Sequence, residues 1–212
     1  MPINRRKQNG TSVRISYFEP KTWGFWRALI ISFCVCSWLG HWLEIPYTNI
    51  MDALFGIVDD DYAAAVDPWF FPYRIYGYGA LFMTLLLEPC KEWFMSRSKT
   101  APRALLKMLV AAIILSGILE TVFGLIVNQP DAYGEYPFWD NSALPGNILG
   151  QGWIVNDLFI GIVAMVYLWL ILPVICTLLN KIPKCAANTV CAIVVVVFLA
   201  CLLIPSFLGL VV

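Results

Sequence analysis

Among the ionisable side chains within or at the edge of long apolar stretches of this 212-residue chain are Glu44, Arg74, Glu120 and Asp157. Charged groups at membrane depth are expensive, and they usually face a bundle interior or a water-filled cavity. Carboxylates placed there can bind cationic groups or carry protons, and a nearby arginine can balance their charge. A structural ion pair that holds helices together is the competing interpretation.

Each of the three carboxylates shares a helical face with small or polar residues. Residues three or four positions apart lie on the same side of a helix. Three such stripes occur: Ser37, Gly40, His41 and Glu44; Ala112, Ser116, Glu120 and Gly124; Gly150, Trp153, Asp157, Gly161 and Ala164. Small residues let helices approach closely, which explains the glycines by packing alone. Packing does not require a carboxylate.

The composition of the chain is that of a membrane protein. Hydrophobic residues make up 60% of it and charged residues only 13%, whereas about a quarter of the residues of a soluble domain are charged. Five stretches of roughly 20 residues are apolar enough to cross a bilayer. They cover residues 26–47, 74–89, 104–127, 150–179 and 189–212, the fourth with a kink expected at Pro173. We therefore predict an all-α integral membrane protein, with a basic arm at 1–25 and a single five-helix transmembrane domain at 26–212.

Lysine and arginine predict the orientation of these spans. Basic residues cluster before the first span, between the second and third, and between the fourth and fifth. The other two connections carry aspartate and glutamate, including the run Asp59–Asp61. Positively charged loops stay in the cytoplasm. The N-terminus is thus expected in the cytoplasm and the C-terminus outside, in a multi-pass protein of the cell membrane.

With this orientation, the polar groups share one depth. Glu120 lies seven positions before the outer end of its span, and Asp157 lies seven positions after the start of the next. At the rise of an α-helix, both are roughly 10 Å below the outer boundary. Glu44 ends the first span, while Arg74 and Tyr76 begin the second. We expect these five side chains to line one polar cavity that opens outward.

The loop that precedes the fourth span is expected to fold over this cavity as a lid. Trp139 gains by burial, and Asp140 is placed to accept from nearby backbone N–H groups as an Asx turn or N-cap. Pro145 and Gly146 then turn the chain so that the helix N-terminus points toward Glu120. Trp139, Asp140 and Asn147 thus join the candidate ligand-binding residues. An ordinary turn that caps the span is the alternative.

The chain resembles a known family in several short motifs. They are SWLGHWLE (Ser37–Glu44), PYRIYGYGA (Pro72–Ala80), LETVFG (Leu119–Gly124) and WDNSALPGNILGQG (Trp139–Gly152), followed by Pro173. These motifs are similar to those of the putative ABC-transporter type IV (CmpB-like) membrane proteins. The resemblance implies a membrane-embedded transport component. The family has tryptophan, tyrosine and arginine where His41, Asn141 and Gln151 stand here, so the last change argues against an anion site carried by that arginine.

Several kinds of chemistry lack their motifs. No phosphate-binding loop, nucleophile elbow or H-E-x-x-H zinc motif occurs. His41 is the only histidine, so a multi-histidine metal site is excluded. The acidic run Asp59–Asp61 lacks the glycine and glutamate of an EF-hand. The seven cysteines avoid the predicted outer loops, so no disulfide framework is expected. We expect no metal, no cofactor and no nucleic-acid partner, and we assign no catalytic residue.

Three functions remain open at this point. The first is a transporter or permease component that binds a small solute in the outward-facing cavity. The second is a membrane-embedded enzyme acting on a lipid-linked substrate, with paired carboxylates as general acid and base. The third is a non-catalytic partner or regulator of another membrane protein. Membrane lipids are expected partners of such a protein. Five spans are few for an autonomous transporter, so a homo-oligomer or a separate ATPase subunit is also expected.

Overall fold

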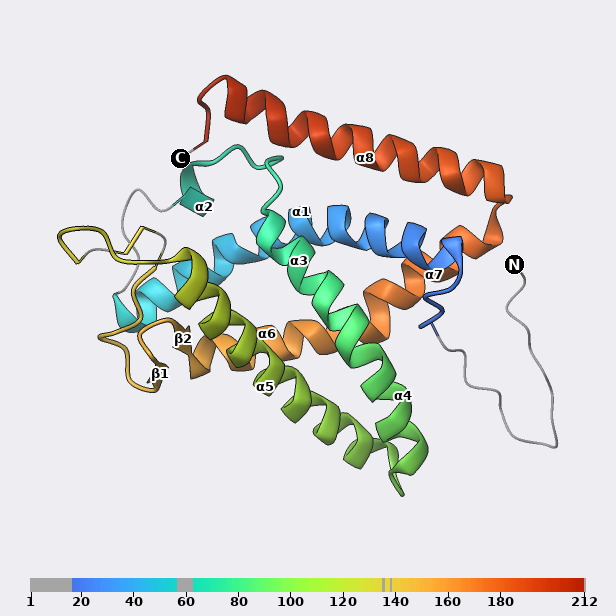
Figure 1. The fold of residues 1–212 in the computed structure, drawn as a ribbon, viewed down its shortest axis with the longest axis horizontal. Coiled ribbons are helices and arrows are strands. Elements are labelled where there is room, and N and C mark those ends of the chain that lie inside the picture. Colours follow the sequence, from blue (N-terminus) through green and yellow to red (C-terminus); the bar gives the residue numbers. More distant parts are fainter. Residues whose placement is uncertain (1–16, 57–62, 135, 138, 212) are drawn as a thin grey trace. The chain divides into compact units, whose positions relative to one another are not determined.

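The computed structural model describes residues 17–56, 63–134, 136–137 and 139–211, and most of these residues are helical (Figure 1). The basic arm up to residue 16 and the run Asp59–Asp61 lie outside the described residues. In chain order the elements are α1 (Trp23–Phe55), α2 (Ala63–Val66), α3 (Arg74–Phe82), α4 (Glu88–Arg97), α5 (Ala101–Val127), β1 (Asn147–Ile148), β2 (Gly152–Trp153), α6 (Ile154–Val166), α7 (Leu172–Lys181) and α8 (Lys184–Phe207).

Four helical stretches of the described chain are long and apolar enough to cross a membrane. They are Trp23–Phe55, Ala101–Val127, Ile154–Lys181 and Lys184–Phe207. The all-α membrane class is therefore confirmed. The predicted span at 74–89 falls in a continuous helical run, Arg74–Arg97, that is not among the four. This run carries Arg74, Glu88, Lys91, Glu92 and Arg97, which lowers its hydropathy. The fifth crossing and the orientation of the termini stay predictions.

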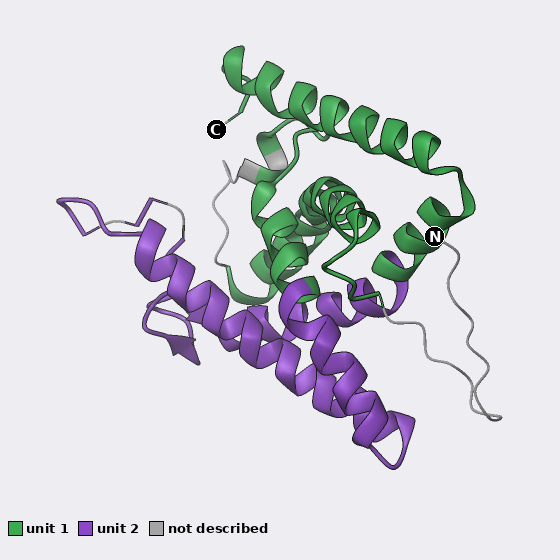
Figure 2. Cartoon of the chain, turned by 45° about the vertical axis from the view of Figure 1, so that its right-hand side comes forward, with its two compact units in different colours: residues 1–84, 172–212 green, residues 85–171 purple. Residues whose placement is uncertain are grey.

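The chain forms two compact units, drawn in two colours in Figure 2. Unit 1 consists of residues 1–84 and 172–212, and unit 2 of residues 85–171. The single transmembrane domain expected over 26–212 stays a prediction.

Unit 1 packs α3, α7 and α8 against α1. Between α1 and α3 the contact depends on glycine, because a Cβ at Gly40 would overlap the ring of Tyr76. The backbone N–H of Tyr73, just before α3, donates to the carbonyl of Ser37 over 3.0 Å. At the other end of α1, Ala28 and Ile31 form a hydrophobic seam with residues of α7 and α8, namely Leu179, Ala187 and Cys191.

Helix α1 is longer than its predicted span. It continues without a break past Pro46 to Phe55 and ends at Gly56, whose φ of 61° gives the left-handed cap. Residues 48–55, beyond the predicted end of the first span, therefore form the last turns of α1. An interior proline removes a backbone hydrogen bond, but helices of membrane proteins tolerate it where neighbouring groups satisfy the freed carbonyl.

Unit 2 is built on the pairing of α5 with α6, and α4 packs against α5. The buried face of α5 consists of small residues at helical spacing, with Ala104, Ala112, Ser116, Gly117 and Gly124 among them. On α6 the buried residues are Asp157, Gly161 and Ala164. Such faces bring helix backbones close together, which sets the distance between the polar groups that the two helices carry.

Two π-helical segments interrupt the helices. In each case one residue separates the end of the segment from a proline. Met83–Leu87 is followed by Glu88 and Pro89, and Tyr167–Ile171 by Leu172 and Pro173. A π-turn pairs each carbonyl with the N–H five residues on, and proline has none. The partner of the Leu168 carbonyl would be Pro173. That carbonyl instead accepts from the Nζ of Lys91 over 2.9 Å.

The Lys91 ammonium makes two further contacts within unit 2. It pairs with Glu88 over 2.7 Å and lies 5.1 Å from the centre of the Trp169 ring. The predicted kink at Pro173 is thus a π-helical segment whose freed carbonyl is satisfied by a lysine of α4.

Candidate functional site

The best candidate site is the carboxylate pair Glu120 and Asp157, which the α5–α6 contact brings together. Asp157 lies over Gly117 of α5, where a Cβ would come within 2.9 Å of its Oδ2 atom. One turn away, a Cβ at Gly161 would come within 2.6 Å of the Ile113 side chain and 3.2 Å of the Ile113 backbone nitrogen. Glycine at both positions lets the Asp157 carboxylate reach the face that carries Glu120.

The Glu120 carboxylate is held by the start of α6. Its Oε2 atom accepts from the backbone N–H of Trp153 over 3.3 Å. Its Oε1 atom accepts from the side-chain amide of Asn156. The positive end of a helix dipole and two N–H donors favour negative charge at this position. The start of α6 therefore lies beside Glu120, as the sequence predicts.

The Asp157 carboxyl group is buried and only partly satisfied. Its residue is 2% exposed. It interacts with the carboxyl group of Glu120 and the hydroxyl of Ser116. Its Oδ1 atom has no hydrogen-bond partner, and neither does the buried hydroxyl of Thr121 on the same face of α5. A buried polar atom left without a partner costs about 1–3 kcal/mol.

This arrangement limits the charge that the pair can carry. Two neighbouring carboxyl groups in a low-dielectric site cannot both ionise unless something positive lies between them. A shared proton satisfies this requirement, and so does a bound cation. The pair is thus suited to hold one positive charge and to exchange it.

The loop from Asn128 to Trp153 is organised by Gln151, which is 2% exposed. The carbonyl of Gln151 accepts from the indole N–H of Trp139 over 2.9 Å and from the amide of Asn141 over 2.6 Å. Its side-chain oxygen accepts from Asn128 over 2.9 Å. A Cβ at Gly124 would come within 2.5 Å of that oxygen. Gln151 therefore fixes the loop to the end of α5.

Like Trp139, the candidate residues Asp140 and Asn147 form hydrogen bonds within the loop. Asp140 accepts from the backbone N–H of Ser142 over 2.8 Å, the expected Asx turn. Hydrogen bonds from Ser142 keep the pKa of Asp140 below its ordinary value. The amide of Asn147 donates to Leu144 over 2.9 Å and accepts from Gly150 over 3.1 Å. Ligand contacts of these residues, and the lid itself, stay predictions.

Glu44, Tyr76 and Arg74 belong to unit 1. The Tyr76 hydroxyl donates to the Glu44 carboxylate over 2.6 Å. Arg74 is exposed, and Lys91–Glu88 is the sole ion pair found in the described part of the chain. Arg74, the candidate counter-charge for Glu44 or Glu120, therefore forms no ion pair with Glu44 among the described residues, and the hydroxyl of Tyr76 binds that carboxylate instead.

The single histidine is a buried part of unit 1. His41 is 0% exposed and stacks on Tyr73, with 4.1 Å between ring centres. Its Nδ1 atom lies 2.6 Å from the carbonyl oxygen of Phe71. These contacts favour the packed, hydrogen-bonded role over a catalytic one.

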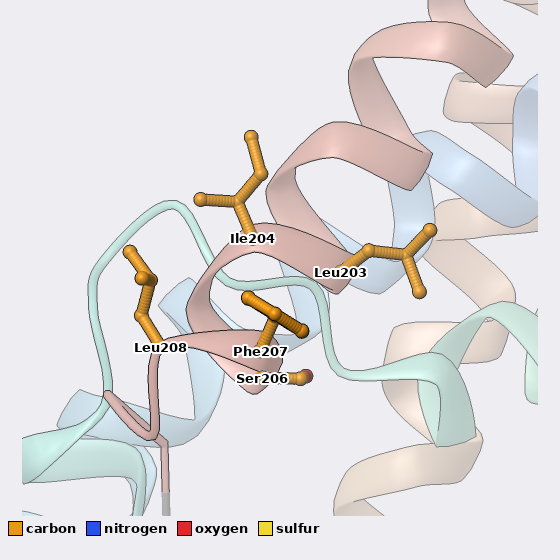
Figure 3. A pocket seen from close by; sticks show the side chains of 5 residues that line it. All are labelled: Leu203, Ile204, Ser206, Phe207 and Leu208. Atoms are coloured by element: carbon orange, nitrogen blue, oxygen red, sulfur yellow. The ribbon is translucent and has the colours of Figure 1, made fainter.

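Two grooves in the structure are apolar, and both belong to unit 1. One surrounds the end of α8, where Figure 3 shows Leu203, Ile204, Ser206, Phe207 and Leu208. The other is lined by Trp26, Leu29, Ile30, Phe33 and Leu81. Neither contains a predicted site residue, and apolar grooves on membrane spans are surfaces that lipid chains can fill.

Comparison with known proteins identifies one relationship. A family model described as "Putative ABC-transporter type IV" matches residues 31–205. No curated protein and no solved structure matches the chain. The matched range includes the α5–α6 pair, the loop fixed by Gln151 and all three predicted carboxylates.

Proposed function

Because this chain belongs to the Putative ABC-transporter type IV family, we propose that it is a membrane-embedded transporter component. It binds the cationic group of a small solute at the Glu120–Asp157 pair. When no solute is bound, a proton occupies the pair.

The observation that carries this proposal is the unsatisfied Oδ1 atom of Asp157. It is buried beside a second carboxyl group and lacks a hydrogen-bond donor. A primary ammonium offers three donors and one positive charge. It would donate to Oδ1 and supply the one positive charge that the shared proton supplies in the empty site. A packing role would be served equally well by an apolar side chain of the same shape.

The finer parts of the proposal come from the sequence. The pair faces a cavity open to the outside, the N-terminus lies in the cytoplasm, and the loop that contains Trp139, Asp140 and Asn147 covers the pair. The membrane is the cell membrane. Because the chain has no phosphate-binding loop, any ATP hydrolysis belongs to a separate subunit.

Thermal unfolding of the purified protein tests solute binding. We expect primary amines of small solutes to raise the melting temperature, and their uncharged amides of the same size to leave it unchanged. At a concentration of 100 times Kd, the stabilisation is about 2.7 kcal/mol. Because protons compete for the pair, the shift should shrink as the pH is lowered. The variant Glu92→Gln, which removes an exposed carboxylate of α4, should behave like the wild type.

Equal shifts for amines and amides would contradict the proposal. Turnover of a lipid-linked substrate by the purified protein would favour the enzyme instead. If no solute changes the unfolding temperature, but the protein is recovered with a second membrane protein that it stabilises, the regulatory role is favoured.

A further inference from the structure

We propose that the junction of α1, α7 and α8 in unit 1 binds the phosphate of an anionic phospholipid headgroup through Arg27. This junction is separate from the Glu120–Asp157 pair, and the described structure shows no counter-charge for Arg27.

Arg27 is 5% exposed, although it lies near the start of α1. Its Nη1 atom donates to the side-chain oxygen of Asn188 over 3.0 Å. Its Nε atom is buried and has no hydrogen-bond partner. No ion pair of Arg27 occurs among the residues that the structure describes, and residues 1–16 contain no acid. A buried guanidinium without a counter-charge is strongly unfavourable.

The side chain that accepts from Arg27 carries a further donor. Asn188 accepts on one oxygen from both Arg27 and the indole of Trp23, over 3.0 Å each. Two donors at that atom identify it as the oxygen, so the NH2 group of Asn188 faces elsewhere. Asn188 itself is exposed. Its amide can therefore donate to a ligand that also reaches Arg27.

The N-terminus of α8 adds to this positive field. The helix begins at Lys184 after Pro183, without a side-chain cap. Its first N–H groups are thus open to an anion, and the helix dipole favours negative charge there. Lys184 is exposed. Arg27 of α1 and Asn188 of α8 are joined by a hydrogen bond, and the seam that includes Ala28, Ala187 and Cys191 packs the same two helices together.

Membrane depth identifies the source of the phosphate. Trp23 and Trp26 are 57% and 42% exposed, and they lie beside Arg27 on α1. Exposed tryptophans at the end of a span mark the headgroup level. Basic pockets between transmembrane helices at this level suit anionic lipids. A phospholipid would place its phosphate on Arg27 and its acyl chains along the apolar faces of the helices.

Native mass spectrometry of the detergent-purified protein tests the proposal. Phosphatidylglycerol and phosphatidylcholine are added separately, and bound lipid is counted. We expect the wild type to retain phosphatidylglycerol preferentially. Arg27→Met should lower this affinity about 10-fold or more, the effect of losing a hydrogen bond to a charged group. Arg103→Met removes an exposed arginine of α5 and should retain the lipid like the wild type.

The stability of the same variants gives a second readout. Without added lipid, Arg27→Met should unfold at the same temperature as the wild type or higher, because it removes an uncompensated buried charge. Phosphatidylglycerol should raise the melting temperature of the wild type and of Arg103→Met, but not that of Arg27→Met.

Undiminished retention of phosphatidylglycerol by Arg27→Met overturns the proposal. It is also overturned if inorganic phosphate alone stabilises the wild type as much as the lipid does, since the ligand would then be a free anion. If Arg27→Met fails to fold, Arg27→Lys decides. A lysine keeps the charge but not the guanidinium fork, so weaker retention supports the site and equal retention refutes it.

Discussion

Replacing Asp157 with leucine is expected to stabilise the purified protein while abolishing its response to amines. Leucine branches at the same carbon as aspartate and has nearly the same shape. It removes the buried Oδ1 atom that has no partner, and with it a penalty of about 1–3 kcal/mol. A site that sacrifices stability for function behaves in this way.

The measurement is thermal unfolding with and without a primary amine. The control Glu92→Leu removes an exposed acid and should change neither the stability by more than about 0.5 kcal/mol nor the amine response. A loss of stability in Asp157→Leu would show that the Asp157 carboxylate serves the fold. Its role in the proposed site would then be refuted.

Replacing Gly161 with alanine is expected to destabilise unit 2 and to weaken amine binding together. The new Cβ would come within 2.6 Å of Ile113 Cγ1, and the Ile113 backbone nitrogen at 3.2 Å leaves little room for relief. Overpacking of this kind costs about 1–3 kcal/mol. Helix α6 would have to move away from α5, and Asp157 would move with it.

A double-mutant cycle separates crowding from other effects. Ile113→Ala in the Gly161→Ala background removes the side-chain clash but not the backbone contact, so we expect partial recovery of both stability and binding. The control is Gly79→Ala in α3, where a Cβ meets nothing within 4 Å. Equal losses in Gly161→Ala and Gly79→Ala would mean that the α5–α6 approach does not position the site.

Much of the fold could be read from local properties of the sequence. Apolar stretches of membrane length predicted the third and fourth spans within a few residues of Ala101–Val127 and Ile154–Lys181. The predicted end of the first span at residue 47 is too early, because the helix continues through the polar residues Thr48, Asn49 and Asp52. Helix α1 tolerates them and continues to Phe55.

The sequence predicted the two carboxylates of the site but not the residues that hold them in place. Glu120 and Asp157 stood out because carboxylates are rare in apolar spans. Gly117, Trp153 and Asn156 were given no role in holding these carboxylates, since a glycine contact or a helix-start N–H donor depends on which helices pair. Gln151 was noted only as a departure from the family arginine. Its role in the loop comes from hydrogen bonds that no spacing rule reveals.

In the proposed site, Glu120 and Asp157 share a proton that a cationic solute displaces. Labelling with a hydrophobic carbodiimide tests this most directly, because the reagent attacks protonated carboxyl groups in apolar surroundings. Peptide mass spectrometry should find the label on Glu120 or Asp157, and a stabilising amine should protect the pair while its amide analogue does not. A pair that stays unlabelled across the acidic and neutral range, or that is labelled equally with and without the amine, would contradict the account.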